Sequence, residues 1–455
     1  MLQEKAFSWW REPEMKRYVR IFWLAWVVLW GVGCSPQGPS VSLSLSRAAP
    51  GEEVEARLTG ISSQGALVYV GGVEALVTGR DGGRLWFRVP GLPGGPQPVR
   101  VVSGGQEARG MLSVLGTVDP SRVLLRLPLG QTPRLPTGFT LERLDDLQGC
   151  GFALAELGYS GETLGRALAE LEAQDPSYKA DPESLWSLGA TQGGPVVGAP
   201  LAQSRGHRGQ GVQVAVLDTG VDPAVPQLQG YDVVEDDTVP QDAFPGGHGT
   251  GAAGLVKEVA PEAAILPVRV CDASGVCRAS RVVRGVCWVV QHHQGPTVLS
   301  LSLGGDTPVE ALKLALQAAL GQGLPVATAA GNQGNQGSPT HYPAAFDLPG
   351  LVAVGALQAS PTGWQPAPYS TQGSYVDLAA PGTDLDCVQP GGATGSCTGT
   401  SFATPLVAGA MALWLETQPT LTPAQLQQAL QQHAKPLPYP AQAVGAGMLD
   451  LSQAP

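Results

Sequence analysis

Three residues whose side chains could act together in catalysis follow one another in the C-terminal part of the sequence. Asp218 ends the apolar run 214–217, His248 stands between two glycines, and Ser401 opens the mainly apolar stretch 402–416. The carboxyl ends of parallel strands are where open α/β sheets build their sites. A buried carboxylate is costly unless it is hydrogen-bonded, and an imidazole ring is a partner that satisfies it. A carboxylate, an imidazole and a hydroxyl together suit nucleophilic attack on a carbonyl carbon.

Each of these residues also has an ordinary structural explanation when it is considered alone. Asp218 could form a turn, His248 could be a loop residue beside glycine, and Ser401 could be the N-cap of a helix. As a nucleophile, Ser401 would instead place the negative oxygen of the transition state near free backbone N–H groups at the positive end of that helix. The residues around each side chain decide between these explanations.

The sequences around the three residues together resemble the signatures of the subtilase family of serine proteases. They read Asp-Thr-Gly at 218–220, His-Gly-Thr at 248–250 and Gly-Thr-Ser-Phe-Ala-Thr-Pro at 399–405, in the chain order of subtilisin. The resemblance covers residues 189–455 and implies a serine endopeptidase that hydrolyses peptide bonds through an acyl-enzyme intermediate. Its catalytic triad would be Asp218, His248 and Ser401.

Further strings in this region match the family's substrate-binding elements. Ala-Ala-Gly-Asn at 329–332 matches the oxyanion motif, in which the Asn332 amide donates to the developing negative oxygen. Leu-Ser-Leu-Gly-Gly at 301–305 matches the segment that pairs with an extended substrate, and residues 275–277 match the opposite edge of the cleft. The residues predicted to bind substrate are Gly275, Ser302, Leu303, Gly304, Ala329, Ala330 and Gly331.

Two residues near the predicted first specificity pocket bear on substrate choice. Gln333 follows the oxyanion asparagine, and His341 precedes the Tyr342-Pro343 turn that borders this pocket in relatives. Neither adds a fixed negative charge. We therefore expect no strong preference for Arg or Lys before the cleaved bond.

The segments between these motifs alternate between strand and helix patterns. Apolar, β-branched runs at 212–217, 297–303 and 325–328 predict buried strands, and apolar residues at helical spacing predict helices over 309–320 and 401–416. Such alternation favours a mostly parallel sheet covered by helices on both faces. The predicted fold class is therefore α/β, as in the subtilisin-like catalytic domain that the resemblance places at 189–455.

Two smaller domains are predicted before the catalytic domain. Short alternating strands with Gly and Pro turns over residues 40–118 indicate a β-sandwich, and strings such as Val70-Gly71-Gly72 resemble Ig-like domains of the IPT/TIG type. This sandwich would be a spacer or, alternatively, a ligand-binding module. Residues 121–186 combine strand, helix and extended tail, and resemble a subtilase propeptide whose tail occupies the active-site cleft; a plain linker domain is the alternative.

The N-terminal residues 1–34 have the pattern of a signal peptide. Lys16, Arg17 and Arg20 precede the apolar run 21–30, which is too short to span a bilayer. Cys34 follows at the position of a bacterial lipobox cysteine, although Gly31 stands where family lipoboxes usually have Leu. The resemblance implies a cell-envelope lipoprotein with its lipid on Cys34. Plain secretion is the alternative.

The remaining six cysteines permit disulfides in an exported chain. We expect local bridges Cys271–Cys277 and Cys387–Cys397. Cys150 and Cys287 are expected to stay free, because a bond between propeptide and protease would oppose release of the propeptide. The spacing of the six cysteines matches no zinc motif.

Composition limits the partners of this chain of 455 residues. A net charge of −11 argues against nucleic acid, which requires clustered Lys and Arg. Protein or peptide substrates are the expected partners, a membrane would be reached through the lipid, and the oligomeric state is open. The chemistry requires no cofactor. Structural calcium is conceivable, and Asp222, Asp236 and Asp237 are weak candidate ligands.

A rival function is an inert or self-processing surface protein that uses the same fold for binding. Inert relatives usually lose a triad residue or the oxyanion asparagine, and this sequence keeps all four. Enzymatic activity is therefore the favoured hypothesis.

Overall fold

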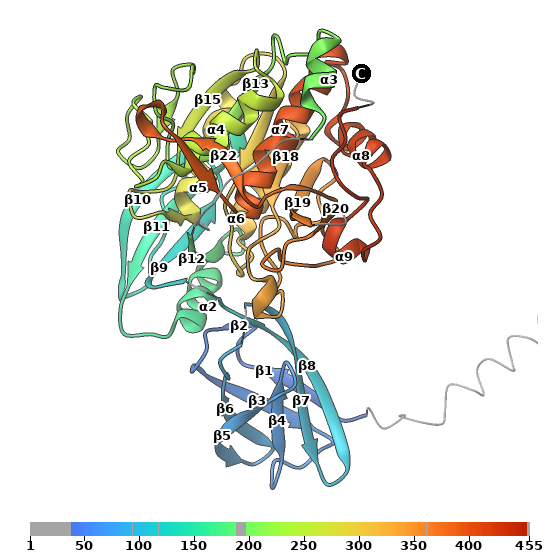
Figure 1. Ribbon diagram of the computed structural model, residues 1–455. Helices are drawn as coiled ribbons and strands as arrows, with labels where there is room; N and C mark the ends of the chain where they lie inside the picture. Colours follow the sequence, from blue (N-terminus) through green and yellow to red (C-terminus); the bar gives the residue numbers. More distant parts are fainter. Residues whose placement is uncertain (1–37, 93, 117, 188–196, 361–362, 453–455) are drawn as a thin grey trace, which may run out of the picture.

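The computed structural model describes residues 38–92, 94–116, 118–187, 197–360 and 363–452 of the chain (Figure 1). These residues form three consecutive units. The predicted signal peptide and its cysteine lie outside the described residues. Within the described ranges, no helix is long and apolar enough to cross a membrane.

Within its described residues, the first unit, drawn in blue in Figure 1, contains strands and no helix. They are β1 (Ser40–Leu43), β2 (Arg47–Ala48), β3 (Glu53–Thr59), β4 (Leu67–Val70), β5 (Val73–Asp81), β6 (Arg84–Arg88), β7 (Gly95–Ser103) and β8 (Gln106–Val114). Their spatial order is β1-β3-β6-β5-β4-β7-β8-β2. Val54 on β3 and Phe87 on β6 are fully buried while the residues on either side of them are partly or fully exposed, because successive residues of a strand point to opposite faces.

The second unit is a sheet with one helix packed on it. Its elements are β9 (Val118–Leu127), β10 (Phe139–Leu147), η1 (Gln148–Cys150), β11 (Phe152–Tyr159), α2 (Leu164–Gln174) and β12 (Lys179–Ser187). Leu164, Leu168 and Leu171 of α2 are buried against the sheet at the predicted helical spacing. The strand order is β10-β11-β9-β12-β16, so the sheet continues into β16 (Val276–Arg278) of the third unit.

The third unit contains the parallel sheet that the alternating pattern predicts. The strands of this unit are β13 (Gln213–Asp218), β14 (Tyr231–Asp232), β15 (Ala264–Arg269), β16, β17 (Thr297–Leu301), β18 (Val326–Ala329), β19 (Leu351–Ser360), β20 (Gly363–Pro366), β21 (Leu378–Pro381), β22 (Leu385–Val388) and β23 (Thr394–Cys397). The main sheet has the order β14-β15-β13-β17-β18-β19-β20, and all pairs from β14 to β19 are parallel.

Helices cover both faces of this sheet. The helices of the third unit are α3 (Ala199–Ser204), α4 (His248–Val259), α5 (Ala279–His292), α6 (Glu310–Gly321), η2 (Gly334–Gln336), η3 (Pro390–Gly392), α7 (Thr400–Thr417), α8 (Pro423–His433) and α9 (Ala441–Val444). Along β13, Val214 and Val216 join the core formed with α4 and α7, whereas Ala215 and Leu217 join the core formed with α5 and α6. The predicted α/β architecture of this unit is confirmed.

Three disulfides are present, of which one joins the second unit to the third and two lie within the third unit. Cys271–Cys277 and Cys387–Cys397 are present, as predicted. Cys150 and Cys287 also form a disulfide, so the prediction that they are free was wrong. The reason is close packing: η1 lies on α5, and a Cβ at Gly149 would be 2.9 Å from the carbonyl oxygen of Cys287. The spacing of the cysteines in the sequence does not reveal this contact.

Candidate active site

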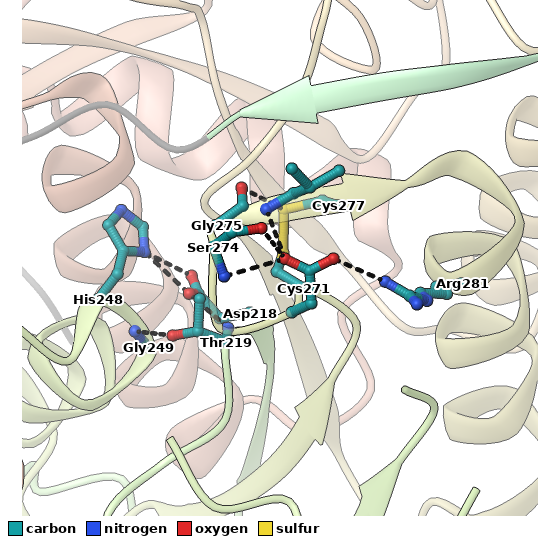
Figure 2. Close-up of a disulfide and its surroundings, with 11 residues drawn as sticks. Asp218, Thr219, His248, Gly249, Cys271, Ser274, Gly275, Cys277 and Arg281 are labelled. Carbon is teal, nitrogen blue, oxygen red and sulfur yellow. Dashed lines mark hydrogen bonds and ion pairs between the residues drawn. A yellow bond between two sulfur atoms is a disulfide. The ribbon is translucent and has the colours of Figure 1, made fainter. Parts of the chain in front are cut away.

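Asp218 and His248 form a buried pair at the carboxyl end of the parallel sheet. Asp218 is the last residue of β13, and His248 is the first residue of α4. His248 Nδ1 lies 2.8 Å from Asp218 Oδ1 and 3.0 Å from Oδ2 (Figure 2). The Asp218 side chain is fully buried and the His248 side chain is 3% exposed. This contact fixes the ring orientation and leaves Nε2 as the nitrogen that can face a reacting group.

The turn after Asp218 holds the pair in register. Asp218 Oδ1 accepts the Thr219 N–H at 2.7 Å, and Thr219 Oγ1 accepts the Gly249 N–H at 2.9 Å. A side chain at Gly249 would clash with the carbonyl oxygen of Gly220, 2.2 Å from the Cβ position. The glycine after His248 therefore permits β13 and α4 to approach each other.

A second buried carboxylate, Asp242, supports the start of α4 and was missed by the sequence reasoning. Its Oδ2 accepts the Thr250 N–H at 2.9 Å and the Thr250 hydroxyl at 2.7 Å. Burial raises the pKa of the Asp242 carboxyl, and the nearby charge of Asp218 acts in the same direction. Asp242 belongs to a loop without a distinctive motif, so no local signal marked it.

Ser401 lies in the first turn of α7 and is 2% exposed. Its Oγ and the Nε2 of His248 are both buried without a hydrogen-bond partner within the described part of the chain. The His248 ring packs on the ring of Phe402, the residue after Ser401, with centroids 4.6 Å apart. The ring contact places the start of α7 beside His248, whose Nδ1 contacts Asp218, while no hydrogen bond joins Ser401 Oγ to His248 Nε2. The three predicted triad residues lie in one place.

Asn332 faces the same point as the Ser401 hydroxyl. The Thr400 N–H and hydroxyl donate to Asn332 Oδ1 at 2.9 and 3.0 Å, which leaves the amide Nδ2 free to donate elsewhere. A Cβ at Gly399, where φ is +151°, would lie 2.8 Å from Ser401 Oγ and 3.3 Å from Asn332 Nδ2. Thr400 therefore orients the amide, a role that the sequence reasoning did not assign to it.

A cavity of about 250 Å³ opens beside Ser401 and Asn332. Five of the predicted substrate-binding residues line it: Ser302, Leu303, Gly304, Ala329 and Gly331. Ala330 does not line it, because its carbonyl oxygen accepts the Tyr375 hydroxyl and its N–H donates to Val354. The cavity also includes Gln333, Gln336, His341 and Thr400.

The buried imidazole of His341 lines this cavity. Cβ positions built at Gly304 and Gly331 would lie 2.5 Å from its Nε2 and 2.8 Å from its Nδ1, so both glycines are required beside the ring. Its Nδ1 has no hydrogen-bond partner among the described residues. Burial lowers the pKa of His341 to about 4, because the imidazolium would lose its hydration.

Gly275 lies apart from the cavity, in the loop before β16. The disulfide Cys271–Cys277 closes this loop (Figure 2). Asp272 accepts the N–H groups of Ser274 and Val276. The N–H of Cys271 donates to the backbone oxygen of Asp218 at 3.1 Å. The loop is therefore fastened directly to the residue that holds His248.

The predicted substrate edge at β16 is paired with the chain's own strand β12. The antiparallel register joins Leu185 to Arg278 and Ser187 to Val276. The sequence predicts that an extended substrate peptide binds at this edge. The end of the second unit occupies the edge instead, as an extended strand.

The weak calcium candidates do not gather into a site. Asp236 pairs with Arg143 and accepts the Tyr231 hydroxyl, while Asp222 and Asp237 accept backbone N–H groups two residues further on. In the described ranges, no group of three or more His, Cys, Asp or Glu residues could hold a metal ion. Structural calcium therefore stays a prediction, and no step of the chemistry is assigned to it.

The fold and the site together define a class, that of serine hydrolases with an Asp–His–Ser order. Comparison with known proteins identifies the family: the model described as the subtilase family matches residues 209–447. The "Subtilisin" of Bacillus pumilus is 39% identical over 251 residues, which cover 52% of this chain and 88% of that protein. Subtilisin E of Bacillus subtilis (strain 168) is 39% identical over 251 residues, and the match covers 52% of this chain and 64% of that protein. The chain belongs to the subtilase family of serine endopeptidases.

A solved structure shares the fold over a longer part of the chain. Fervidolysin from Fervidobacterium pennivorans, a keratinolytic enzyme related to subtilisin, superposes with a TM-score of 0.62 at 21% sequence identity. The match covers 75% of this chain and 62% of that one. It therefore extends beyond the share of the chain that the curated subtilisins match.

Proposed function

We propose that the protein is an endopeptidase in which Ser401 attacks the scissile carbonyl carbon while His248 Nε2 accepts the hydroxyl proton. Asp218 holds the ring through Nδ1 and stabilises the imidazolium that forms. The imidazolium then donates its proton to the leaving amine, and water releases the acyl-enzyme. The observation that carries this proposal is the buried Asp218–His248 pair, with His248 Nε2 and Ser401 Oγ left without other partners.

The developing negative oxygen would be stabilised by two donors. The Asn332 Nδ2 group, oriented through Thr400, faces the neighbourhood of Ser401 Oγ. The Ser401 N–H lies at the positive end of α7, and such dipoles favour negative charge. A fixed side-chain donor contributes a factor of about 10² to 10³ in kcat, a magnitude established for subtilisin itself.

The substrate would be an extended polypeptide bound as an added strand between β16 and residues 302–304. Its side chain before the cleaved bond would enter the cavity beside Ser401. No aspartate or glutamate belongs to the described lining of that cavity, and Gln333, Gln336 and His341 supply neutral polar groups. We therefore propose neutral side chains, rather than Arg or Lys, at this position of the substrate.

The second unit would be an inhibitory propeptide, and the protein a zymogen. Two of its carboxylates reach the N-termini of catalytic-domain helices. Asp181 accepts the Ala311 N–H of α6 at 3.0 Å, and Glu183 accepts the Ser280 N–H of α5 at 3.3 Å. Helix N-termini attract negative charge, so these contacts support docking of β12 at the substrate edge. The first unit would be a spacer.

Export also remains part of the proposal. The signal pattern at residues 1–34 supports secretion, and Cys34 would carry a lipid that holds the protein at the cell envelope. Mass spectrometry of the N-terminal peptide from a native host tests this. A peptide that begins at Cys34 with acyl groups is expected, and a mature chain that begins beyond Cys34 would contradict anchoring.

The decisive variant for the proposed function is Ser401→Ala. We expect it to lack peptide hydrolysis and to accumulate as a folded, full-length precursor, since loss of this nucleophile in subtilisin lowers kcat about 10⁶-fold. Hydrolysis of unfolded casein by the unaltered protein is the companion measurement, because a protein that processes only itself would leave casein intact. Normal maturation of Ser401→Ala in a host lacking other proteases would contradict the assignment.

A further inference from the structure

The disulfide Cys150–Cys287 joins two units that propeptide processing would separate. Cys150 ends η1, between β10 and β11 of the second unit, and Cys287 lies in α5 of the third. The two residues are 137 positions apart, and the junction between the units falls within that interval. A cut at this junction would leave the two fragments covalently joined.

Buried ion pairs hold the same contact together. Arg284, one helical turn before Cys287, bonds to Asp145 at 2.5 Å and to Glu156, both from the second unit. The guanidinium side chain is only 7% exposed. Any other arrangement of the two units that kept Arg284 buried would leave its charge unpaired, so these ion pairs fix how the two units meet.

The first unit is fastened to the second in turn. Glu52 of the first unit accepts the Gly165 N–H at 3.2 Å and the Thr163 hydroxyl at the start of α2. Arg47 donates to the Ala180 carbonyl oxygen at 2.6 Å and pairs with Asp181 at 3.7 Å. The two N-terminal units would therefore stay or leave as one body.

We propose that the mature protein is a two-chain molecule, in which Cys150–Cys287 keeps the N-terminal fragment on the catalytic domain until a dithiol reductant releases it. This rests on the proposed function, because it takes the chain to be cut between the second and third units. The dithiol supplies two electrons and two protons: its own sulfurs become a disulfide, and Cys150 and Cys287 become thiols. Release of β12 then frees the substrate edge at β16.

The tether changes how inhibition responds to dilution. A free inhibitory fragment dissociates when the protein concentration falls below its dissociation constant. A linked fragment instead has an effective concentration on the order of millimolar that dilution does not alter. The linked protein should therefore keep a constant, low activity per molecule on dilution, whereas an unlinked one should become more active.

The experiment uses the full chain purified without reductant. Gels run with and without reductant are compared, and activity per molecule is followed over about a thousandfold dilution. We expect one band without reductant, two with it, and constant activity on dilution. The double variant Cys150→Ser/Cys287→Ser should give two separable fragments without reductant and an activity that rises on dilution.

The matched control is Cys387→Ser/Cys397→Ser, which removes a disulfide whose two cysteines both lie in the third unit. It should keep the two fragments linked. Fragments of the unaltered protein that separate without reductant would overturn the tether while leaving the proposed protease intact. An uncut chain in both gels would instead contradict the processing on which both proposals rest. The gels need only the unaltered protein, so a misfolded double variant would not block the test.

Discussion

The surroundings of Ser401 and the contact between the second unit and α5 both join residues that lie far apart in the chain, but only the residues around Ser401 stand in recognisable sequence strings. Around Ser401, Thr400 and Gly399 are adjacent in sequence, and the partners Asn332 and His248 each stand in a short string with its own pattern. At the contact with α5, the partners of Arg284 lie 128 and 139 residues away. The residues around Ser401 can be recognised from short sequence strings. The contact that would control access to them cannot, because no short string marks its residues.

The contact with α5 should respond strongly to loss of its buried cation. Arg284→Met leaves Glu156 without its cation and leaves Asp145 with Arg143 alone, and breaking a buried pair in this way costs about 3–5 kcal/mol. In the Ser401→Ala background we expect the second unit to become sensitive to limited proteolysis by an added protease.

The matched control for that variant is Arg166→Met on α2, whose partner Glu162 is exposed. This i,i+4 pair has side chains 65% and 44% exposed, and exposed pairs contribute at most about 0.5 kcal/mol. Equal sensitivity of the two variants would mean that the contact with α5 does not hold the second unit.

Replacement of Asn332 should slow the reaction without weakening substrate binding. Asn332→Ala is expected to lower kcat by about 10² to 10³ with little change in KM, because the amide acts on the transition state. Thr400→Val should lower kcat in the same sense, and Thr400→Ser should restore it. In the Asn332→Ala background, Thr400→Val should have little further effect, since positioning residues are coupled to the group they orient. Fully additive losses would contradict that role of Thr400.

Burial of His341 predicts how stability depends on pH. Its pKa falls from 6.5 to about 4 in the folded state, so the unfolded chain binds the additional proton first as pH decreases. The free energy of unfolding linked to the neutral His341 ring is fully present above pH 6.5. It is lost progressively down to about pH 4, and the loss amounts to about 3 kcal/mol in all.

This pH dependence is measured by denaturant unfolding of Ser401→Ala with and without His341→Gln. The variant should flatten the loss of stability between these pH values, while His292→Gln, at an exposed position, should not. An unchanged profile in His341→Gln would show that the ring is not held neutral by burial.

The sequence predicted the parallel sheet, its helices, and the residues that meet at Ser401, because strand and helix periods and short motifs are local properties. It missed Asp242 and the orienting role of Thr400, which depend on where a loop and a side-chain amide settle after folding. Its assignment of Cys150 and Cys287 as free failed for the same reason: η1 meets α5 only when the second unit docks. Contacts between units are set by surface fit, and spacing in sequence does not encode them.

The central claim is that Ser401 is the one hydroxyl activated by His248, and covalent labelling tests it most directly. An organophosphorus reagent that phosphorylates activated serines is added to the mature protein, and the modified peptide is located by mass spectrometry. The account predicts a single adduct on Ser401, and none when His248 is replaced by Ala. An adduct on Thr400, or undiminished labelling of Ser401 in His248→Ala, would contradict it.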